Sequence, residues 1–372
     1  MPMSALPSSF QAFRIHNDEE GFRANWEPQS IDEQTSGDVV IEVHYSSVNY
    51  KDALAGTNRG KILRRFPLNG GIDVAGVVLA SESDRFAIGD SVLMTGSGLS
   101  ETKDGGYSEY LRVSSEFLVP LPTNLTLHES MIIGTAGFTA ALALSRMEAN
   151  GQTPEMGPIA VTGATGGVGS LAIDIFTKAG YQVSAITGKT EAFDWLHSLG
   201  AAQCIDRHGL YWPESPLASA QFAGALDNVG GDMLNGLTRV IRPWGNIASC
   251  GMAASMGLNT TVMPFIIRGV SLLGINSAGC PYSLRASIWD KLANDWRPNH
   301  LASIHTKTIG PDELKDAFEA LIDGTNQGRI VVDLRPQPPT RKKTTKKRVA
   351  KKKATRKKAA QKKANQTKEK TS

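Results

Sequence analysis

The segment Val161–Gly169, with the sequence VTGATGGVG, constrains this chain more than any other part of it. Apolar residues lead into it and a helix-like run follows from Val168, which predicts a strand, a tight turn and a helix. In such a turn Gly166 lets the backbone approach a pyrophosphate, and Gly169 lets the helix pack closely on its strand. Ala164 replaces the first glycine of the usual G-x-G-x-x-G, so the turn alone is weak evidence for a dinucleotide site.

The residues after the turn repeat the same alternation of apolar runs and helical patterns. This alternation predicts a doubly wound α/β unit with a parallel sheet. The alternative is a Gly-rich turn in an α/β protein that binds no nucleotide. Strands are expected at 181–187, 202–206, 224–230 and 245–251, and helices at 191–199 and 232–241.

The end of the second expected strand bears on the choice of nicotinamide cofactor. An acidic residue at this place would hold a free ribose 2′-hydroxyl, but the chain has Thr187, Gly188 and Lys189 there. A lysine beside a hydroxyl suits a 2′-phosphate, which predicts NADPH over NADH. The alternative is that Lys189 is an ordinary solvated lysine.

Length and cysteine content narrow the class of protein further. The 372 residues suffice for two domains with full cores. We expect a cytoplasmic protein with no membrane contact, because no uninterrupted apolar run is long enough to cross a bilayer and no signal peptide is recognisable. Three widely spaced cysteines provide neither a disulfide framework nor a C-x-x-C pair.

The formal charge of +4 hides a division between body and tail. Residues 335–372 carry 17 of the 40 Lys and Arg residues but one of the 36 acidic residues, so residues 1–334 have a formal charge of −12. The tail offers almost nothing to bury, and we expect it to be disordered. Its cations predict non-specific, salt-sensitive nucleic-acid binding. A tail that only solubilises, or that folds back on the acidic body, is the alternative.

Residues 38–120 have the pattern of a β-rich domain, and the chain as a whole resembles a known family. The resemblance is to the medium-chain dehydrogenase/reductase superfamily over residues 10–334, and within it to the zinc-free acryloyl-CoA reductase and quinone oxidoreductase-like proteins. It rests, besides the Gly-rich turn, on the motifs at 46–54, 60–67, 71–76, 132–140 and 262–268.

The resemblance implies a fold and a set of domain boundaries. The fold is α/β, with a Rossmann doubly wound parallel sheet inserted in a β-rich GroES-like catalytic domain. The expected boundaries are 1–133 for the first part of the catalytic domain, 134–298 for the Rossmann domain, 299–334 for the return to the catalytic domain and 335–372 for the tail. A homodimer through an edge strand at 270–275 is also implied.

The metal-ligand positions of zinc alcohol dehydrogenases in this superfamily hold other residues here. Asn49 stands at the place of the catalytic Cys, and Ile72 and Asp73 stand at the place of the His-Glu pair. The structural zinc lobe is replaced by residues 95–106, which contain no Cys. A tetrahedral zinc site cannot be assembled from these residues. We therefore expect direct hydride transfer to a polarised C=C bond. We also expect Asp52 and Asp73 to tie the loop to its strand.

The same resemblance assigns roles to individual residues. Tyr50 is expected to contact nicotinamide or substrate and to relay a proton, with Asn49 orienting the carbonyl or the cofactor; alternatively Tyr50 only packs on the nicotinamide. Lys61, Arg64 and Arg65 suit the phosphates of a small enoyl-CoA such as acryloyl-CoA, or form an ordinary charged surface. A quinone or enone is the alternative substrate. The expected cofactor-binding residues are Tyr50, Thr165, Gly166, Gly167, Val168, Thr187, Gly188, Lys189, Asn228 and Arg329.

Overall fold

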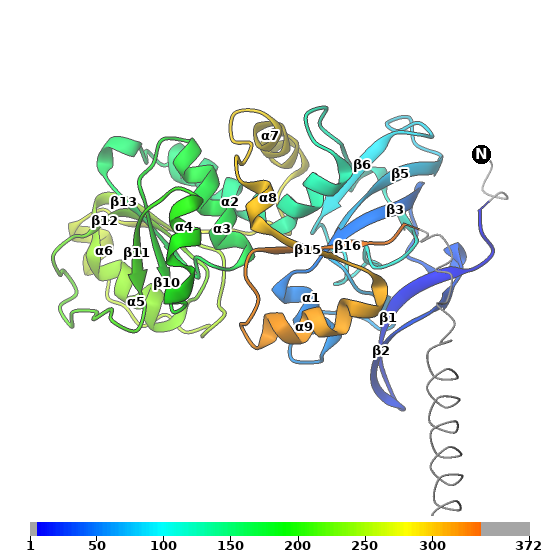
Figure 1. The fold of residues 1–372 in the computed structure, drawn as a ribbon, viewed down its shortest axis with the longest axis horizontal. Coiled ribbons are helices and arrows are strands. Elements are labelled where there is room, and N and C mark those ends of the chain that lie inside the picture. The colour runs from blue at the N-terminus through cyan, green and yellow to red at the C-terminus, as the bar shows by residue number, and fades with distance from the viewer. Residues whose placement is uncertain (1–5, 336–372) are drawn as a thin grey trace, which may run out of the picture. The chain divides into compact units, whose positions relative to one another are not determined.

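The Gly-rich turn follows the strand β9 of a six-stranded parallel sheet (Figure 1). In this computed structural model, which describes residues 6–335, the strand order is β11-β10-β9-β12-β13-β14. In chain order within the sheet this is 3-2-1-4-5-6, the arrangement of doubly wound dinucleotide-binding folds. The strands are β9 (Ile159–Thr162), β10 (Val183–Thr187), β11 (Ala201–Asp206), β12 (Phe222–Asp227), β13 (Ile241–Ser249) and β14 (Ser271–Gly274).

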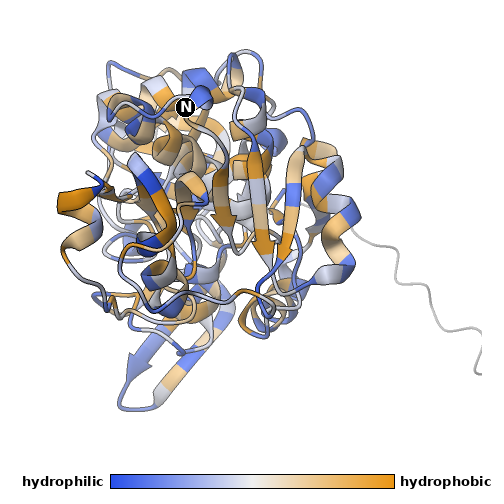
Figure 2. Ribbon diagram, turned by 90° about the vertical axis from the view of Figure 1, so that its left-hand side faces the viewer, coloured by the Kyte–Doolittle hydropathy of each residue, from blue (hydrophilic) through white to orange (hydrophobic). Residues whose placement is uncertain are grey.

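Alternate residues of the central strand β9 face two different helix layers. Ile159 and Val161 belong to the core that includes α2 and α3, whereas Ala160 packs in a second core with α5. Figure 2 shows hydrophobic residues along several strands and hydrophilic residues on many, though not all, of the outer helical turns. Both faces of the sheet are therefore buried, as a parallel sheet requires. The helices are α2 (Leu127–Ala149), α3 (Gly167–Lys178), α4 (Phe193–Ser198), α5 (Gly231–Val240), α6 (Met263–Ile267), α7 (Tyr282–Ala293) and α8 (Leu301–Ile304).

A mixed seven-stranded sheet and a small three-stranded sheet form the β-rich half (Figure 1). Its last strand, β16 (Arg329–Asp333), follows the parallel sheet in sequence but pairs antiparallel with β3 (Val39–Ser47). The chain thus leaves the β-rich half, builds the parallel sheet and returns, which confirms the predicted fold class. The remaining elements of this half are β1 (Phe10–Asp18), β2 (Gly21–Gln29), α1 (Tyr50–Gly56), β4 (Leu68–Asn69), β5 (Asp73–Ser81), β6 (Ser91–Thr95), β7 (Tyr110–Val113), β8 (Val119–Pro120), β15 (His305–Ile309) and α9 (Leu314–Ile322).

The hairpin β1–β2 and a kink in α2 are two features that were not predicted from the sequence. The hairpin turns at Gly21, whose φ of +94° favours glycine. Helix α2 is bent at Gly134, where φ is +50° and ψ is −159°. By length and apolar composition α2 could cross a membrane, but 78% of its most apolar window is buried inside the protein. Packing in the core therefore accounts for its composition.

Two predictions concern residues outside the described range. The disorder of residues 336–372 and their binding to nucleic acid lie outside residues 6–335. Residues 6–335 form one unit, and the expected domain boundaries within the chain stay a prediction.

Candidate active site

The Gly-rich turn joins the end of β9 to the start of α3, and its glycines have different surroundings. A Cβ at Gly169 would lie 2.4 Å from the carbonyl oxygen of Gly163, so only glycine lets α3 approach the turn this closely. A Cβ at Gly166 would meet only that same oxygen, at 3.3 Å. Open space at Gly166, beside the free N–H groups of the first helical turn at Gly167 and Val168, fits a pyrophosphate.

The ends of the neighbouring strands lie beside the Gly-rich turn. Asn228 follows β12, and its amide donates to the carbonyl oxygen of Thr162 at the end of β9 (2.7 Å). These two strands lie at the point where the strand order reverses, which is where open α/β sheets bind ligands. On the other side of β9 lies β10, which ends at Thr187. The hydroxyl of Thr165 in the turn lies 3.4 Å from the hydroxyl of Thr187.

The end of β10 is more basic than Lys189 alone had indicated. Lys189 is half-buried and its Nζ donates to the carbonyl oxygen of Asn326 (2.7 Å), which leaves two N–H donors of the ammonium. A Cβ at Gly188 would lie 2.6 Å from Nε of Arg207 and 2.8 Å from Nε2 of His208. The presence of Arg207 and His208 beside Lys189 was not predicted. Its signal was the Arg-His dipeptide directly after β11, because the carboxyl ends of adjacent parallel strands meet at one edge.

We expect Lys189→Ala and Arg207→Ala each to weaken NADPH binding about 10- to 100-fold and to leave NADH binding unchanged. A charge-assisted hydrogen bond to a phosphate contributes about 1.5–3 kcal/mol, and NADH lacks the phosphate. Fluorescence titrations with both cofactors measure the effect, with Lys178→Ala, an exposed lysine of α3, as the control. Equal losses for NADPH and NADH would contradict a 2′-phosphate role.

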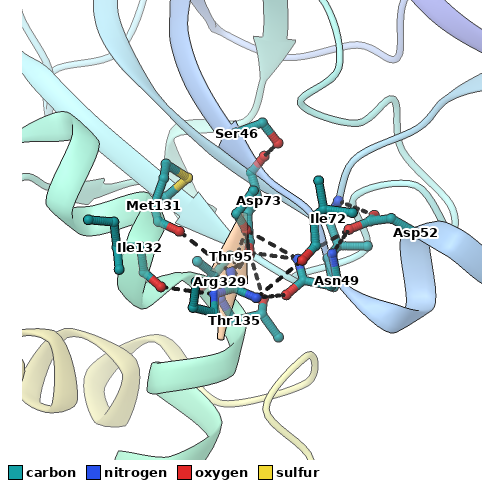
Figure 3. Close-up of polar contacts among 12 residues, drawn as sticks. Ser46, Asn49, Asp52, Ile72, Asp73, Thr95, Met131, Ile132, Thr135 and Arg329 are labelled. Carbon is teal, nitrogen blue, oxygen red and sulfur yellow. Dashed lines mark hydrogen bonds and ion pairs between the residues drawn. The ribbon is translucent and has the colours of Figure 1, made fainter. Parts of the chain in front are cut away.

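The position of the former metal ligand is part of a buried polar network (Figure 3). The amide of Asn49 donates to Asp73 Oδ2 (2.9 Å) and Asp52 Oδ2 (3.1 Å), and its Oδ1 accepts from Nη1 of Arg329 (3.0 Å). Asn49 is only 8% exposed. With its donors and acceptor engaged inside the protein, Asn49 holds the start of α1 in place. Asp52 Oδ1 also accepts from the backbone N–H of Ile72 (2.9 Å), so the expected tie between loop and strand is confirmed.

Asp73 is the centre of this network and collects donors from three segments. Its carboxylate accepts from the hydroxyl of Ser47 (2.5 Å) and from both the backbone N–H (2.9 Å) and the hydroxyl (2.5 Å) of Thr135. Glycine is required at the kink, because a Cβ at Gly134 would lie 2.7 Å from Asp73 Oδ2 and 2.7 Å from Nη2 of Arg329. The second part of α2 therefore begins with its N-terminus on a carboxylate, which is a favourable arrangement.

Arg329 lies inside the same network rather than at the surface of the crevice. Its guanidinium donates to the carbonyl oxygens of Ile132 (2.9 Å) and Val48 (3.2 Å) and to the hydroxyl of Ser47 (2.8 Å), and Nη2 lies 3.9 Å from Asp73. It is 3% exposed, and its Cδ packs beside Gly167 in the turn. Arg329 thus connects the two halves of the molecule beneath the cofactor crevice. Direct contact with a cofactor stays a prediction.

Asp52 should make stability depend on pH. Burial, with Asp73 nearby, raises its pKa to about 7, so between about pH 4 and 7 the folded chain holds a proton that the unfolded chain releases. The stabilisation is complete below pH 4 and is lost as pH rises through 7, by up to about 1.4 kcal/mol per unit. Asp52→Asn removes this ionisation. Urea unfolding from pH 5 to 8 should show the variant losing less stability than wild type; parallel pH curves would contradict the assignment.

Tyr50 and the predicted substrate cations differ in their surroundings. Tyr50 is the first residue of α1 and is 43% exposed. Arg65 donates to the carbonyl oxygen of Thr102 (3.1 Å) and the hydroxyl of Thr35 (2.7 Å), so it braces one loop against another. Lys61 and Arg64 are exposed. The roles of all four in substrate binding stay predictions.

A Gly-rich turn on a 3-2-1-4-5-6 sheet, joined by a buried network to a β-rich half, is typical of nicotinamide-dependent oxidoreductases. Comparison with known proteins agrees. Residues 35–123 match the model of the alcohol dehydrogenase GroES-like domain, and residues 167–294 match that of the zinc-binding dehydrogenases. The chain belongs to the medium-chain dehydrogenase/reductase superfamily, in the group that contains acrylyl-CoA reductases and quinone oxidoreductase-like proteins.

Three relatives illustrate the similarity. The putative quinone oxidoreductase YhfP of Bacillus subtilis is 43% identical over 88% of this chain and 100% of its own, and its structure with NAD bound superposes with a TM-score of 0.85. The probable acrylyl-CoA reductase AcuI of Escherichia coli is 44% identical over 82% of this chain and 94% of its own. The yhdH oxidoreductase of Salmonella enterica, solved with NADP, is 42% identical, covers 87% of this chain and 99% of its own, and has a TM-score of 0.83.

Proposed function

We propose that this protein uses NADPH to reduce the C=C bond of a small enoyl-CoA, converting acryloyl-CoA to propionyl-CoA without a metal. The observation that carries the proposal is the 44% identity to a probable acrylyl-CoA reductase over 94% of that protein. The cations at Lys189 and Arg207 favour NADPH. Asn49 and Ile72, at the positions of metal ligands in zinc-dependent members, favour direct hydride transfer.

The side chains around the crevice support a division of labour in this reaction. When bound, NADPH supplies the hydride for the β-carbon of the enoyl group. The turn at Gly166 holds the pyrophosphate, and the cations at the end of β10 hold the 2′-phosphate. Tyr50, exposed at the start of α1, contacts the substrate and delivers a proton from its hydroxyl to the α-carbon. Asn49 acts as a positioning residue, because its hydrogen bonds to Asp52 and Asp73 fix the backbone that presents Tyr50.

A quinone or enone reductase with the same cofactor is the second candidate. The 43% identity to a putative quinone oxidoreductase, over the whole length of that protein, favours it. Both reactions place hydride on a carbon conjugated to a carbonyl group. They differ in whether the substrate carries the phosphates of coenzyme A.

Oxidation of NADPH with acryloyl-CoA, crotonyl-CoA and 1,4-benzoquinone, measured side by side, tests the proposal. We expect kcat/KM for acryloyl-CoA to exceed that for 1,4-benzoquinone at least 10-fold, with NADPH preferred to NADH. Tyr50→Phe keeps the ring and removes the hydroxyl, so it should lower kcat with little change in KM. Turnover of benzoquinone without turnover of any thioester would overturn the enoyl-CoA assignment.

We also propose a homodimer through the edge strand β14. Unpaired backbone groups and the exposed side chain of Leu272 lie along this edge, and the exposed apolar residues Ile266 and Ile267 lie on the preceding helix α6. Pairing with a second copy would cover both features. Light scattering should give twice the chain mass for wild type and the single chain mass for Leu272→Asp. A monomeric wild-type protein would contradict the proposal.

The basic tail supports a lower-ranked role, tethering of the enzyme to nucleic acid in the cytoplasm. Its excess of Lys and Arg would release counterions on binding, so affinity should fall steeply with salt. Comparison of DNA binding by the full chain and a 1–334 truncation over a salt series tests this role. Equal affinities for the two chains would exclude it, and the truncation should leave turnover unchanged.

A further inference from the structure

A cavity of about 750 Å³ lies between the β-rich half and the segment that follows β14. It is lined from the β-rich half by the loop after β6 and from the other half by the loop that leads into α7. None of the site residues expected from the sequence lines it. The lining side chains used below are Arg85, Glu101, Lys103, Glu116, Cys280 and Tyr282.

The two walls of the cavity are held together by buried contacts. Arg285, only 1% exposed, donates from Nη1 to the carbonyl oxygen of Thr95 (2.6 Å) and from Nη2 to that of Ser277 (2.8 Å). The backbone N–H of Ser97 donates to the carbonyl oxygen of Ala278 (3.0 Å). The cavity is therefore formed before any ligand arrives, which lowers the entropic cost of binding.

The backbone of the loop after β6 is unusual at this wall. Ser97 and Ser100 have φ of +53° and +56°, in the left-handed region that residues other than glycine avoid. Such strain persists only where the surrounding structure enforces it, and it clusters at ligand-binding sites. The loop is thus held in a conformation that its own sequence does not favour.

One wall of the cavity contacts the helix that carries Tyr50. Glu101 in its wall accepts from Nζ of Lys51 (2.5 Å), and Lys51 is the neighbour of Tyr50 in the chain. Thr95, at the end of β6, lies opposite Asp73 in the sheet register. The wall of the cavity is therefore linked to α1, the helix that begins at Tyr50, through the pair of Glu101 and Lys51.

The cations of the cavity retain donors for a ligand. The Arg85 guanidinium lies 4.6 Å from the ring centre of Tyr282, and one of its N–H groups donates to the carbonyl oxygen of Ser115 (2.7 Å). Lys103 Nζ donates to the carbonyl oxygen of Ser97 (2.9 Å), which leaves two ammonium protons. Of the acidic lining residues, Glu101 is paired with Lys51, and Glu116 lines the same cavity as the two cations.

The size and charge of the cavity identify the class of ligand. Sites of about 300–1,000 Å³ hold molecules of drug size, and an acryloyl group alone would fill little of 750 Å³. Two cations with free donors suit phosphates. A coenzyme A thioester has both the length and the phosphates, whereas a quinone or enone, the other candidate substrate, has neither.

We propose that this cavity binds the phosphate-bearing arm of the coenzyme A thioester, with Arg85 and Lys103 as the phosphate contacts. The inference rests on the proposed function and deepens it. It places the phosphate contacts at Arg85 and Lys103 instead of at the cluster of Lys61, Arg64 and Arg65. The cluster lines no part of this cavity. The negative charge of Glu116 repels the phosphates and limits the affinity for coenzyme A.

Steady-state kinetics with two thioesters test the assignment. The double variant Arg85→Gln/Lys103→Gln, which keeps hydrogen-bond donors, should raise KM for acryloyl-CoA at least 10-fold. KM for the N-acetylcysteamine thioester of acrylate, which has no phosphate, should stay within about 2-fold of wild type. Glu116→Gln should lower KM for acryloyl-CoA. The matched control Lys178→Gln/Lys307→Gln removes the same charge at two exposed positions outside the cavity and should change KM less than 3-fold. An equal rise for both thioesters, or a larger rise in the control, overturns the proposal.

Direct binding separates this proposal from the proposed function. Calorimetric titration of coenzyme A should give binding to wild type that weakens at least 10-fold in Arg85→Gln/Lys103→Gln. Bound coenzyme A should also slow alkylation of Cys280, which lines the cavity, as followed by peptide mass spectrometry. If coenzyme A binds and protects Cys280 but no thioester turns over, the function fails and the cavity assignment stands. If acryloyl-CoA turns over while the double variant behaves as wild type, the cavity assignment alone fails.

Discussion

Replacement of Arg329 with Ala should lower the free energy of unfolding by about 3–5 kcal/mol, because removal of one partner from a buried ionic network leaves the others unpaired. Its guanidinium donates to Ile132, Val48, Ser47 and Asn49, and lies 3.9 Å from Asp73. In Arg329→Ala the carbonyl oxygens lose their donor and Asp73 loses the buried cation nearest to it. Turnover should fall at least 100-fold, since Asn49 then no longer fixes the start of α1.

Arg329→Lys is the matched control for this prediction. Lysine keeps the charge but has three donors in place of five, so it cannot reach all the acceptors that the guanidinium connects. We expect a stability between those of wild type and Arg329→Ala in guanidinium chloride unfolding, with the same ranking in kcat/KM. Wild-type stability of Arg329→Ala would show that the network is not what connects the two halves.

The sequence predicted the parallel sheet well because its signals are local. The strands of the Rossmann unit contain short apolar runs that stop at or just before a Gly, Asp or Ser, and the helices between them have their own pattern. The hairpin β1–β2 was missed because its strands mix apolar and charged residues, and its turn, at Asp18–Gly21, gives a weak signal. Signals of pairing between distant segments are absent from a single sequence.

Contacts between distant segments also decide the geometry of the candidate site. The former metal position at Asn49 was identified from its motif, but its hydrogen-bond partners include Asp73 and Arg329, and Arg329 lies 280 positions away in the chain. No local pattern predicts that Gly134 must lack a Cβ so that these side chains can meet. Likewise, the basic cluster at Lys61, Arg64 and Arg65 is conspicuous in sequence, whereas Arg85 and Lys103 meet only in the fold.

Substitution of the two glycines of the turn should affect different properties. Gly169→Ala should mainly lower stability, whereas Gly166→Ala should mainly weaken cofactor binding. In Gly169→Ala the new Cβ would lie 2.4 Å from the Gly163 carbonyl oxygen and 2.7 Å from Ala164 Cα, and backbone atoms cannot move away cheaply. Overpacking of this kind costs about 1–3 kcal/mol of stability. In Gly166→Ala the φ of −77° suits alanine and the only contact within 4 Å is at 3.3 Å, so stability should stay within about 1 kcal/mol of wild type or rise slightly.

NADPH binding, unlike stability, should depend more on Gly166 than on Gly169. Because the space at Gly166 faces the expected pyrophosphate, Gly166→Ala should weaken NADPH binding at least 10-fold in a protein of normal stability. Paired measurements of urea unfolding and NADPH fluorescence on both variants separate the two effects. Gly310→Ala is the matched control, because Gly310 has a similar φ of −87° and a Cβ there would meet no atom within 4 Å. If Gly166→Ala binds NADPH as tightly as wild type does, the cofactor does not approach the backbone at this turn, and the dinucleotide crevice must be placed elsewhere.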